Sequence, residues 1–142
     1  MFFATFDRVI IGIAGALAFV IGLAILIAPE TFFAGYDVVL GTNPALLSEL
    51  RAPCANLAAL GALISAGAFY RPFTLAASCL GAVVFLAFAM GRLVGLSVDG
   101  WPGSGIVIAL GIEMLVGLLC LWSFHRQREK AIAAENTAIS LL

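Results

Sequence analysis

Charged side chains are scarce in this chain. Only 11% of its 142 residues are charged, with 7 Lys and Arg against 8 Asp and Glu, whereas 63% are hydrophobic and the mean hydropathy is +1.16. Soluble domains are about a quarter charged, and disordered chains are richer in charge and poorer in apolar side chains. This composition excludes a water-soluble fold and a disordered chain. With a formal net charge of −1, the chain also lacks the basic excess that binds phosphate backbones, so we expect no nucleic acid partner.

Residue patterns of enzymes and metal sites are missing as well. The chain has one histidine, His125, and three cysteines, Cys54, Cys79 and Cys120, without a C-x-x-C spacing. A haem held between spans commonly needs two axial ligands, which a single histidine does not supply. No Gly-rich phosphate loop, Ser-His-Asp set or carboxylate cluster occurs in the sequence. We therefore expect no catalytic residue, no metal site and no resident cofactor, and we interpret the cysteines as inert buried thiols.

What the chain does contain is four long apolar runs, at residues 9–28, 52–70, 73–96 and 105–124. A bilayer core about 30 Å thick needs roughly 20 mostly apolar residues per helix, and each run is long enough. None of them shows the two-residue alternation of a membrane barrel. We predict an all-α fold, an integral membrane four-helix bundle that forms one domain over residues 1–142. The tail, residues 125–142, is expected to extend the fourth helix.

Lys and Arg residues flanking the runs predict the orientation in the membrane. An even number of spans puts five of them on one side and two on the other: Arg8, Arg71, Arg126, Arg128 and Lys130 against Arg51 and Arg92. The more basic side faces the cytoplasm, so we expect both termini and the tail there, in a multi-pass protein of the bacterial cytoplasmic (inner) membrane. The first run is longer than the apolar part of a signal peptide, so we expect it to remain as a span.

The longest connection, residues 29–51, leaves two alternatives. Asn43 is a good N-cap and Pro44 suits the first helical position, so a helix is predicted to begin there. This helix either runs into the second span with a kink at Pro53 or ends before Pro53 as a separate interfacial helix.

Small residues recur at four-residue spacing in two of the runs. They are Ala58, Ala62 and Ala66 in the second run and Ala87, Gly91 and Gly95 in the third. Small side chains let helix backbones approach closely in lipid, where packing drives association. We predict that these faces pack inside the bundle. The alternative is a contact with a second copy or with another membrane subunit.

Four charged side chains are predicted to form a polar intramembrane or binding site in the outer half of the bundle: Arg51, Arg92, Asp99 and Glu113. Glu113 stands inside an apolar run, where a charge costs about 2.5–3.5 kcal/mol and needs a partner. We expect the third helix to end near Val98 and the fourth to begin near Ser104. Arg92 and Glu113 then lie about 9 and 13 Å from those ends, within an arginine's reach, and should pair. The pair is either a structural clasp or part of a ligand site, and Asp99, on nearly the same helix face as Arg92, could hold the guanidinium from above.

The stretch from Gly91 to Pro102, GRLVGLSVDGWP, followed by Glu113 and by Leu121 and Trp122, resembles an uncharacterised family of small bacterial membrane proteins. That family is known only as a domain of unknown function. It has a G-R-L, D-G, P hairpin, a glutamate in the last span and an arginine opening the second, which Arg51 matches. The resemblance implies a four-helix bundle. The topology is also similar to that of the DoxX-like group, some of whose members are tied to quinone or thiol redox systems.

Two functions are expected from these features. The first is a non-catalytic accessory or assembly subunit that packs against a larger membrane complex, with the lipid bilayer and other membrane subunits as partners. It rests on the small size of the chain, its small-residue faces and the missing enzyme patterns. The alternative is a binder of a quinone, a lipid headgroup or another small anion, which uses Arg51 and Arg92 at the outer mouth of the bundle.

Overall fold

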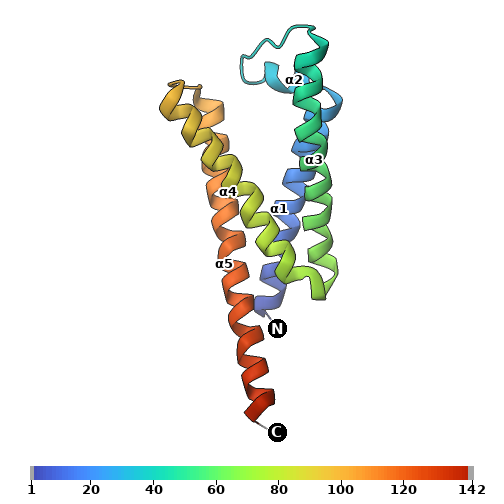
Figure 1. The fold of residues 1–142 in the computed structure, drawn as a ribbon, viewed down its shortest axis with the longest axis vertical. Helices are drawn as coiled ribbons and strands as arrows, with labels where there is room; N and C mark the ends of the chain where they lie inside the picture. The colour runs from blue at the N-terminus through green and yellow to red at the C-terminus, as the bar shows by residue number, and fades with distance from the viewer. Residues whose placement is uncertain (1, 141–142) are drawn as a thin grey trace.

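The structure, a computed structural model, describes residues 2–140, which are helical along most of their length (Figure 1). The elements are α1 (Phe2–Ile27), α2 (Pro29–Ala34), α3 (Pro44–Phe69), the 3-10 turn η1 (Arg71–Phe73), α4 (Thr74–Val98) and α5 (Ser104–Ser140). No strand occurs between residues 2 and 140. Four helices, α1, α3, α4 and α5, are long and apolar enough to cross a membrane. The prediction of an all-α chain with four such helices is confirmed.

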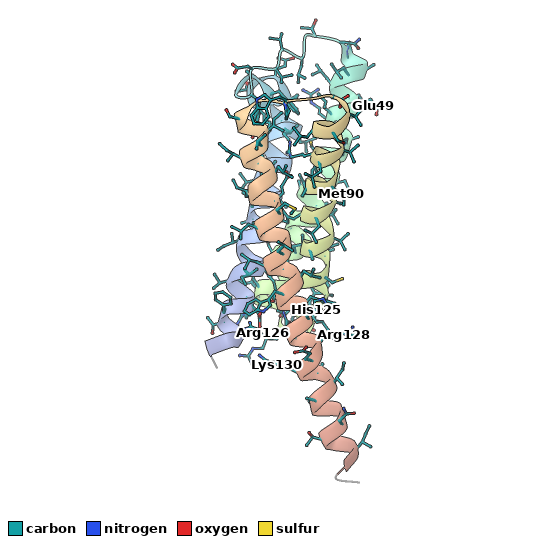
Figure 2. The ribbon with its side chains drawn as sticks, turned by 90° about the vertical axis from the view of Figure 1, so that its left-hand side faces the viewer. Glu49, Met90, His125, Arg126, Arg128 and Lys130 are labelled. Atoms are coloured by element: carbon teal, nitrogen blue, oxygen red, sulfur yellow. The ribbon has the colours of Figure 1, made fainter. Side chains whose placement is uncertain are left out.

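The four long helices form two antiparallel pairs, α1 with α3 and α4 with α5. Figure 1 shows that the pairs meet where α1 begins and α3 ends, and that they diverge towards the opposite end. We name the end where the two pairs meet the terminal end. The opposite end, which carries α2 and the connection between α4 and α5, is the hairpin end. At the terminal end α5 continues past the other helices (Figure 2), so the predicted extension of the fourth helix into the tail is confirmed as far as Ser140.

The start of α3 settles the alternatives for the longest connection. The Asn43 side chain accepts hydrogen bonds from the backbone N–H groups of Ala45 at 2.9 Å and Leu46 at 3.4 Å, and Pro44 follows as the first helical residue. The helix then continues through Pro53 to its end. One continuous helix therefore carries the chain from the connection into the apolar run, and the separate interfacial helix is wrong.

Glycines bring α1 and α3 into backbone contact. A Cβ added at Gly15 would overlap the backbone of Ser65, and one added at Gly61 would overlap the backbone of Phe19. Only residues without a side chain fit at these two positions. Such close approach favours association of helices in lipid, where the hydrophobic effect between them is absent.

Most of the small residues at four-residue spacing do not pack inside this chain, which leaves their predicted alternative, a contact with a second copy or another subunit, as a prediction. Ala58 is buried, but Ala62, Ala66, Ala87 and Gly91 are exposed and Gly95 is half-buried. A helix turns about 100° per residue, so each four-residue step drifts by about 40° around the axis. The buried face of α3 avoids this drift by mixing three- and four-residue steps, through Leu57, Ala58, Gly61, Ile64 and Gly67.

Two arginines tie α1 and α3 together reciprocally. Near the start of α1, Arg8 donates a hydrogen bond from Nε to the carbonyl of Ala68, in the last turn of α3. Near the start of α3, Arg51 donates from Nε to the carbonyl of Leu26, in the last turn of α1, at 3.2 Å. The last carbonyls of a helix have no partner inside it, and a cation beside them complements the helix dipole. Each arginine therefore caps the neighbouring helix.

The connection between α4 and α5 turns on two glycines. Gly100 has φ +92° and Gly103 has φ +96°, a backbone region that residues with a side chain rarely adopt. This short turn fixes the height of α5 against α4. At the same end, the Tyr36 ring lies close to Gly105, whose added Cβ would be 3.0 Å from it.

The core lies towards the terminal end. Side chains from all four long helices meet there, among them Ile11 of α1, Ile64 of α3, Phe85 of α4 and Cys120 of α5. Each of these four is at most 4% exposed. The shared core explains why the two pairs stay together at this end, and it leaves the hairpin end more open.

Candidate functional site

Arg92 and Glu113 form an ion pair between α4 and α5. The Nε of Arg92 donates to both carboxylate oxygens of Glu113, at 2.9 Å to Oε1 and 2.7 Å to Oε2. The Arg92 side chain is 32% exposed and the Glu113 side chain 13%. Because α4 ends at Val98 and α5 begins at Ser104, as expected, the heights of the two side chains match. The pair that the sequence predicted is present.

The other two predicted site residues lie apart from this pair. Asp99 follows the last residue of α4 and is exposed, and within residues 2–140 it forms no ion pair with Arg92. Arg51 belongs to the α1–α3 pair through its hydrogen bond to Leu26. No contact joins Arg51 to Arg92 among the described residues, and the helix pairs that carry them diverge at this end (Figure 1).

A second ion pair, which sequence reasoning missed, ties α1 to α5 at the terminal end. The Asp7 carboxylate accepts hydrogen bonds from the Arg126 guanidinium and from the Ser123 hydroxyl, the latter at 2.7 Å. Gln127 donates at 2.9 Å to Ser123 and at 2.9 Å to Ser78 of α4. Asp7 is only 3% exposed. These five residues, named the terminal cluster below, join three helices.

Aromatic rings cover the guanidinium of the terminal cluster. The Cζ of Arg126 lies 4.3 Å from the Trp122 ring centroid and 6.0 Å from that of Phe6. The two rings meet edge to face, with their centroids 5.8 Å apart. A cation over an aromatic face is attracted by the ring's quadrupole, more strongly where water is excluded. Arg126 therefore does more than mark the orientation of a span.

The sequence did carry a signal for this cluster. Asp7 is an acid that flanks the first apolar run on the side that the basic residues occupy. Ser78 and Ser123 are hydroxyl residues inside apolar runs, where a polar group needs a partner. An acid beside a basic flank, combined with two hydroxyls at similar depth, could have pointed to a shared contact.

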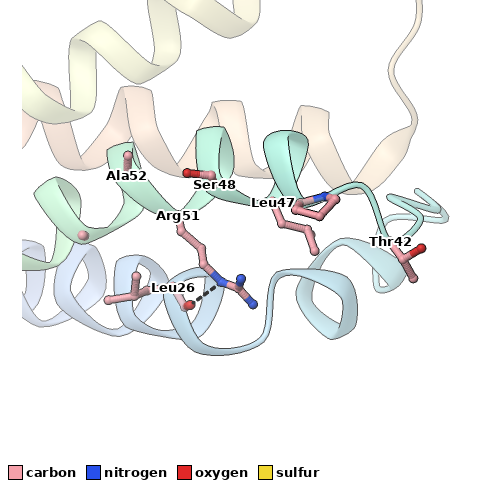
Figure 3. A pocket seen from close by; sticks show the side chains of 8 residues that line it. Leu26, Thr42, Leu47, Ser48, Arg51 and Ala52 are labelled. Carbon is pink, nitrogen blue, oxygen red and sulfur yellow. Dashed lines mark hydrogen bonds between the residues drawn. The ribbon is translucent and has the colours of Figure 1, made fainter.

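Arg51 faces an open pocket of about 440 Å³ at the hairpin end of the α1–α3 pair (Figure 3). Its walls come from the end of α1, the connection before α3 and the first turns of α3, and they include Leu26, Thr42, Leu47, Ser48 and Ala52. Figure 3 shows the Arg51 side chain reaching across to the Leu26 carbonyl. Among the described residues that line the pocket, Arg51 alone is charged.

The cysteines are free thiols with different surroundings. Cys120 is buried against Gly81, whereas Cys54 and Cys79 are half-buried, which corrects the expectation of three buried thiols. Among the side chains that the structure describes, no three of His, Cys, Asp or Glu gather into a group that could hold a metal ion.

Comparison with known proteins identifies the family. The family model described as "Domain of unknown function (DUF4345)" matches residues 6–124. The chain belongs to the DUF4345 family. This membership agrees with the resemblance to an uncharacterised family. The matched part of this DUF4345 protein includes Asp7, Arg51, Arg92 and Glu113 but ends before Arg126. No curated protein and no solved structure matches the chain.

Proposed function

We propose that this DUF4345 protein spans the bacterial inner membrane four times, with both termini in the cytoplasm. Arg126, Arg128 and Lys130 lie together at the terminal end, far from Glu49 at the hairpin end (Figure 2), and basic flanks stay in the cytoplasm. The test is a reporter enzyme that is active only outside the cytoplasm, fused after Gly41, Arg71 or Leu142. We expect activity at Gly41 alone. Activity at either of the other two positions would contradict the orientation.

Within that membrane, we propose that the protein is a non-catalytic accessory or assembly subunit that packs against a larger membrane protein. The observation that carries this proposal is the open surface of α5. Only 11% of the apolar stretch of α5 is buried inside the chain, against 33–44% in α1, α3 and α4. Because lipid covers apolar side chains as well as a protein does, exposure alone does not distinguish a protein partner from lipid. The small residues beside this surface make that distinction.

Small residues on the α4–α5 pair support a helix of another protein as the occupant of that surface. Gly91 of α4 and Gly111 of α5 are exposed, and a Cβ added at either would meet no atom within 4 Å. Both lie near the level of the ion pair formed by Arg92 and Glu113. Open backbone at such positions allows close helix contact. With Ala87 also exposed, these positions favour the alternative of a contact with another subunit over packing inside the bundle.

The experiment compares a photo-crosslinking residue at Leu115 of α5 with the same residue at Ile13 of α1, because both side chains are 60% exposed. At Leu115 we expect one adduct with a larger membrane protein, which also co-purifies in stoichiometric amount. At Ile13 we expect lipid adducts only. Gly111→Leu should abolish the Leu115 adduct and leave the melting temperature unchanged. Lipid adducts alone at both positions, or an adduct with a second copy of the chain, would contradict the proposal.

The alternative of a protein that binds a quinone, a lipid headgroup or another small anion stays a prediction, as does the similarity to the DoxX-like group. A solitary protein that retains a quinone through purification, read from the absorbance of its organic extract, would favour this alternative over the accessory role.

A further inference from the structure

We propose that the Arg51 pocket binds a phosphate ester, in the form of a phospholipid headgroup. This inference concerns a ligand of the α1–α3 pair and does not depend on the accessory role of the α4–α5 surface. It rests on the charge of the pocket, the anchoring of its arginine, and the mixture of polar and apolar walls at the end of an apolar helix.

The charge of the pocket selects an anion. Arg51 contributes a positive charge, no acidic residue is present among the described residues that line the pocket, and Thr42 and Ser48 add hydroxyl groups to its walls. Hydroxyls donate hydrogen bonds to phosphate oxygens, and a guanidinium presents several donors in a planar fork that matches them. The Arg51 guanidinium therefore supplies donors that match a phosphate group, and the two hydroxyls add polar groups to the same pocket.

The hydrogen bond that anchors Arg51 leaves part of its guanidinium group available to a ligand. Within residues 2–140, the Arg51 side chain donates a hydrogen bond from Nε to the carbonyl oxygen of Leu26, with 3.2 Å between the two atoms. This contact holds the guanidinium at the pocket while its two terminal NH2 groups remain for a ligand. Figure 3 shows these terminal nitrogens beyond the bonded Nε. A guanidinium that is already held in place loses less conformational entropy when it binds a phosphate.

The position and walls of the pocket favour a lipid over a free anion. Leu26 is the penultimate residue of α1, a helix apolar enough to cross a membrane, so the pocket lies where hydrocarbon is expected to give way to headgroups. Leu26, Leu47 and Ala52 make part of its wall apolar, and a volume of about 440 Å³ leaves room beyond a phosphate for the glycerol and the start of the acyl chains. Basic pockets between transmembrane helices on the cytoplasmic side of membranes bind lipid headgroups through the same chemistry.

Arg8 provides a matched control for the structural role of Arg51. Both arginines donate from Nε to a carbonyl in the last turn of the neighbouring helix, so each substitution removes one equivalent cap. The space beside Arg8 is smaller, about 260 Å³, and its lining, Thr5, Arg8, Val9, Ala68 and Phe69, has one hydroxyl residue where the Arg51 pocket has two. If Arg51 served only as a cap, Arg8→Gln and Arg51→Gln would have the same consequences.

The experiment is native mass spectrometry of the full chain in mild detergent, titrated with dihexanoyl phosphatidylglycerol. We expect one bound lipid, a loss of affinity of at least tenfold in Arg51→Gln, and unchanged affinity in Arg8→Gln. Ala52→Leu narrows the pocket without touching the hydrogen bond from Arg51 to Leu26, and it should also lose at least tenfold. Ala62→Leu adds the same side chain at an exposed position of α3 outside the pocket, and it should bind like the wild type.

Three results would overturn the proposal. If Arg51→Gln or Ala52→Leu kept the wild-type affinity, the lipid would bind outside this pocket. If Arg8→Gln lost as much affinity as Arg51→Gln, the effect would come from the loss of a helix cap. Inorganic phosphate that displaces the lipid at equal concentration would show a site for the free anion and overturn the lipid assignment. Ala52→Leu decides the matter if Arg51→Gln does not fold.

Discussion

Removing one member of the Arg92–Glu113 pair should destabilise the protein more than removing both. Arg92→Leu strands the Glu113 carboxylate, whose side chain is only 13% exposed. Glu113→Leu strands the Arg92 guanidinium, whose side chain is 32% exposed and whose long stem can carry the charge towards water. The exposures therefore predict an order: Arg92→Leu is the most damaging change, Glu113→Leu is intermediate and the double substitution is the mildest.

The magnitudes follow from the partial burial of the pair. Breaking a fully buried ion pair by removing one partner costs about 3–5 kcal/mol. Because the stranded Glu113 is 13% exposed and the stranded Arg92 is 32% exposed, we expect about 2–3 kcal/mol for Arg92→Leu and about 1–2 kcal/mol for Glu113→Leu. The double variant strands no charge and should lose less than about 1 kcal/mol. The coupling energy, the sum of the single losses minus the double loss, should be at least about 2 kcal/mol.

The assay is reversible unfolding of the four proteins in mixed micelles, followed by helical circular dichroism as the fraction of denaturing detergent is raised. Additive single losses would refute the reasoning, because two residues that do not interact show no coupling. A larger loss in Glu113→Leu than in Arg92→Leu would refute the argument from exposure. A double variant that folds but loses a species retained by the wild type would show that the pair belongs to a ligand site and is more than a clasp.

Two further predictions concern the contacts of α1, and thermal unfolding in detergent measures both. Gly61→Leu should lower the stability by about 1–3 kcal/mol through overpacking against the α1 backbone. Its control, Ala62→Leu, lies at an exposed neighbour and should leave the melting curve unchanged. Identical melting curves for the two variants would refute the glycine contact. Asp7→Asn should cost about 3 kcal/mol, because it strands the Arg126 charge. Its control is Asp37→Asn, at an exposed residue with φ +61° that asparagine tolerates, and equal losses in the two variants would contradict a structural role for Asp7.

The features that sequence reasoning predicted well are those that depend on one helix at a time. Apolar runs of sufficient length predict spans, and a cap such as Asn43 marks a helix start, because both depend on local chemistry. The pairing of Arg92 with Glu113 also came within reach, since helical rise per residue is regular and the connection between their helices is short. Once the two helix ends were estimated, the heights of both side chains followed.

The features that sequence reasoning missed depend on how the helices cross one another. The face of α3 that meets α1 is set by the direction in which the two axes run past each other, so a four-residue repeat of small residues did not identify it. Ala62 and Gly61 are adjacent in sequence, yet only Gly61 lies in the contact. Asp7 and Arg126 are 119 residues apart, and each flanks an apolar run, where charges are ordinarily solvated. Their meeting requires the first and last helices to lie side by side; the acid, the basic flank and the two hydroxyls indicate a shared polar contact, but they do not identify which helices form it.

The two ion pairs act at different levels of the fold. The pair of Arg92 and Glu113 joins consecutive helices that already share a short turn, so it fixes their register within one antiparallel pair. The pair of Asp7 and Arg126 joins α1 to α5, and Gln127 extends the contact to α4, so the terminal cluster fixes one helix pair against the other. Because the pairs diverge at the hairpin end (Figure 1), where Tyr36 lies close to Gly105, the terminal cluster and the adjacent core contribute strongly to how far apart the pairs stand there. Weakening the terminal cluster should therefore change the hairpin end at a distance, whereas weakening the Arg92–Glu113 pair should leave the joint between the two pairs intact.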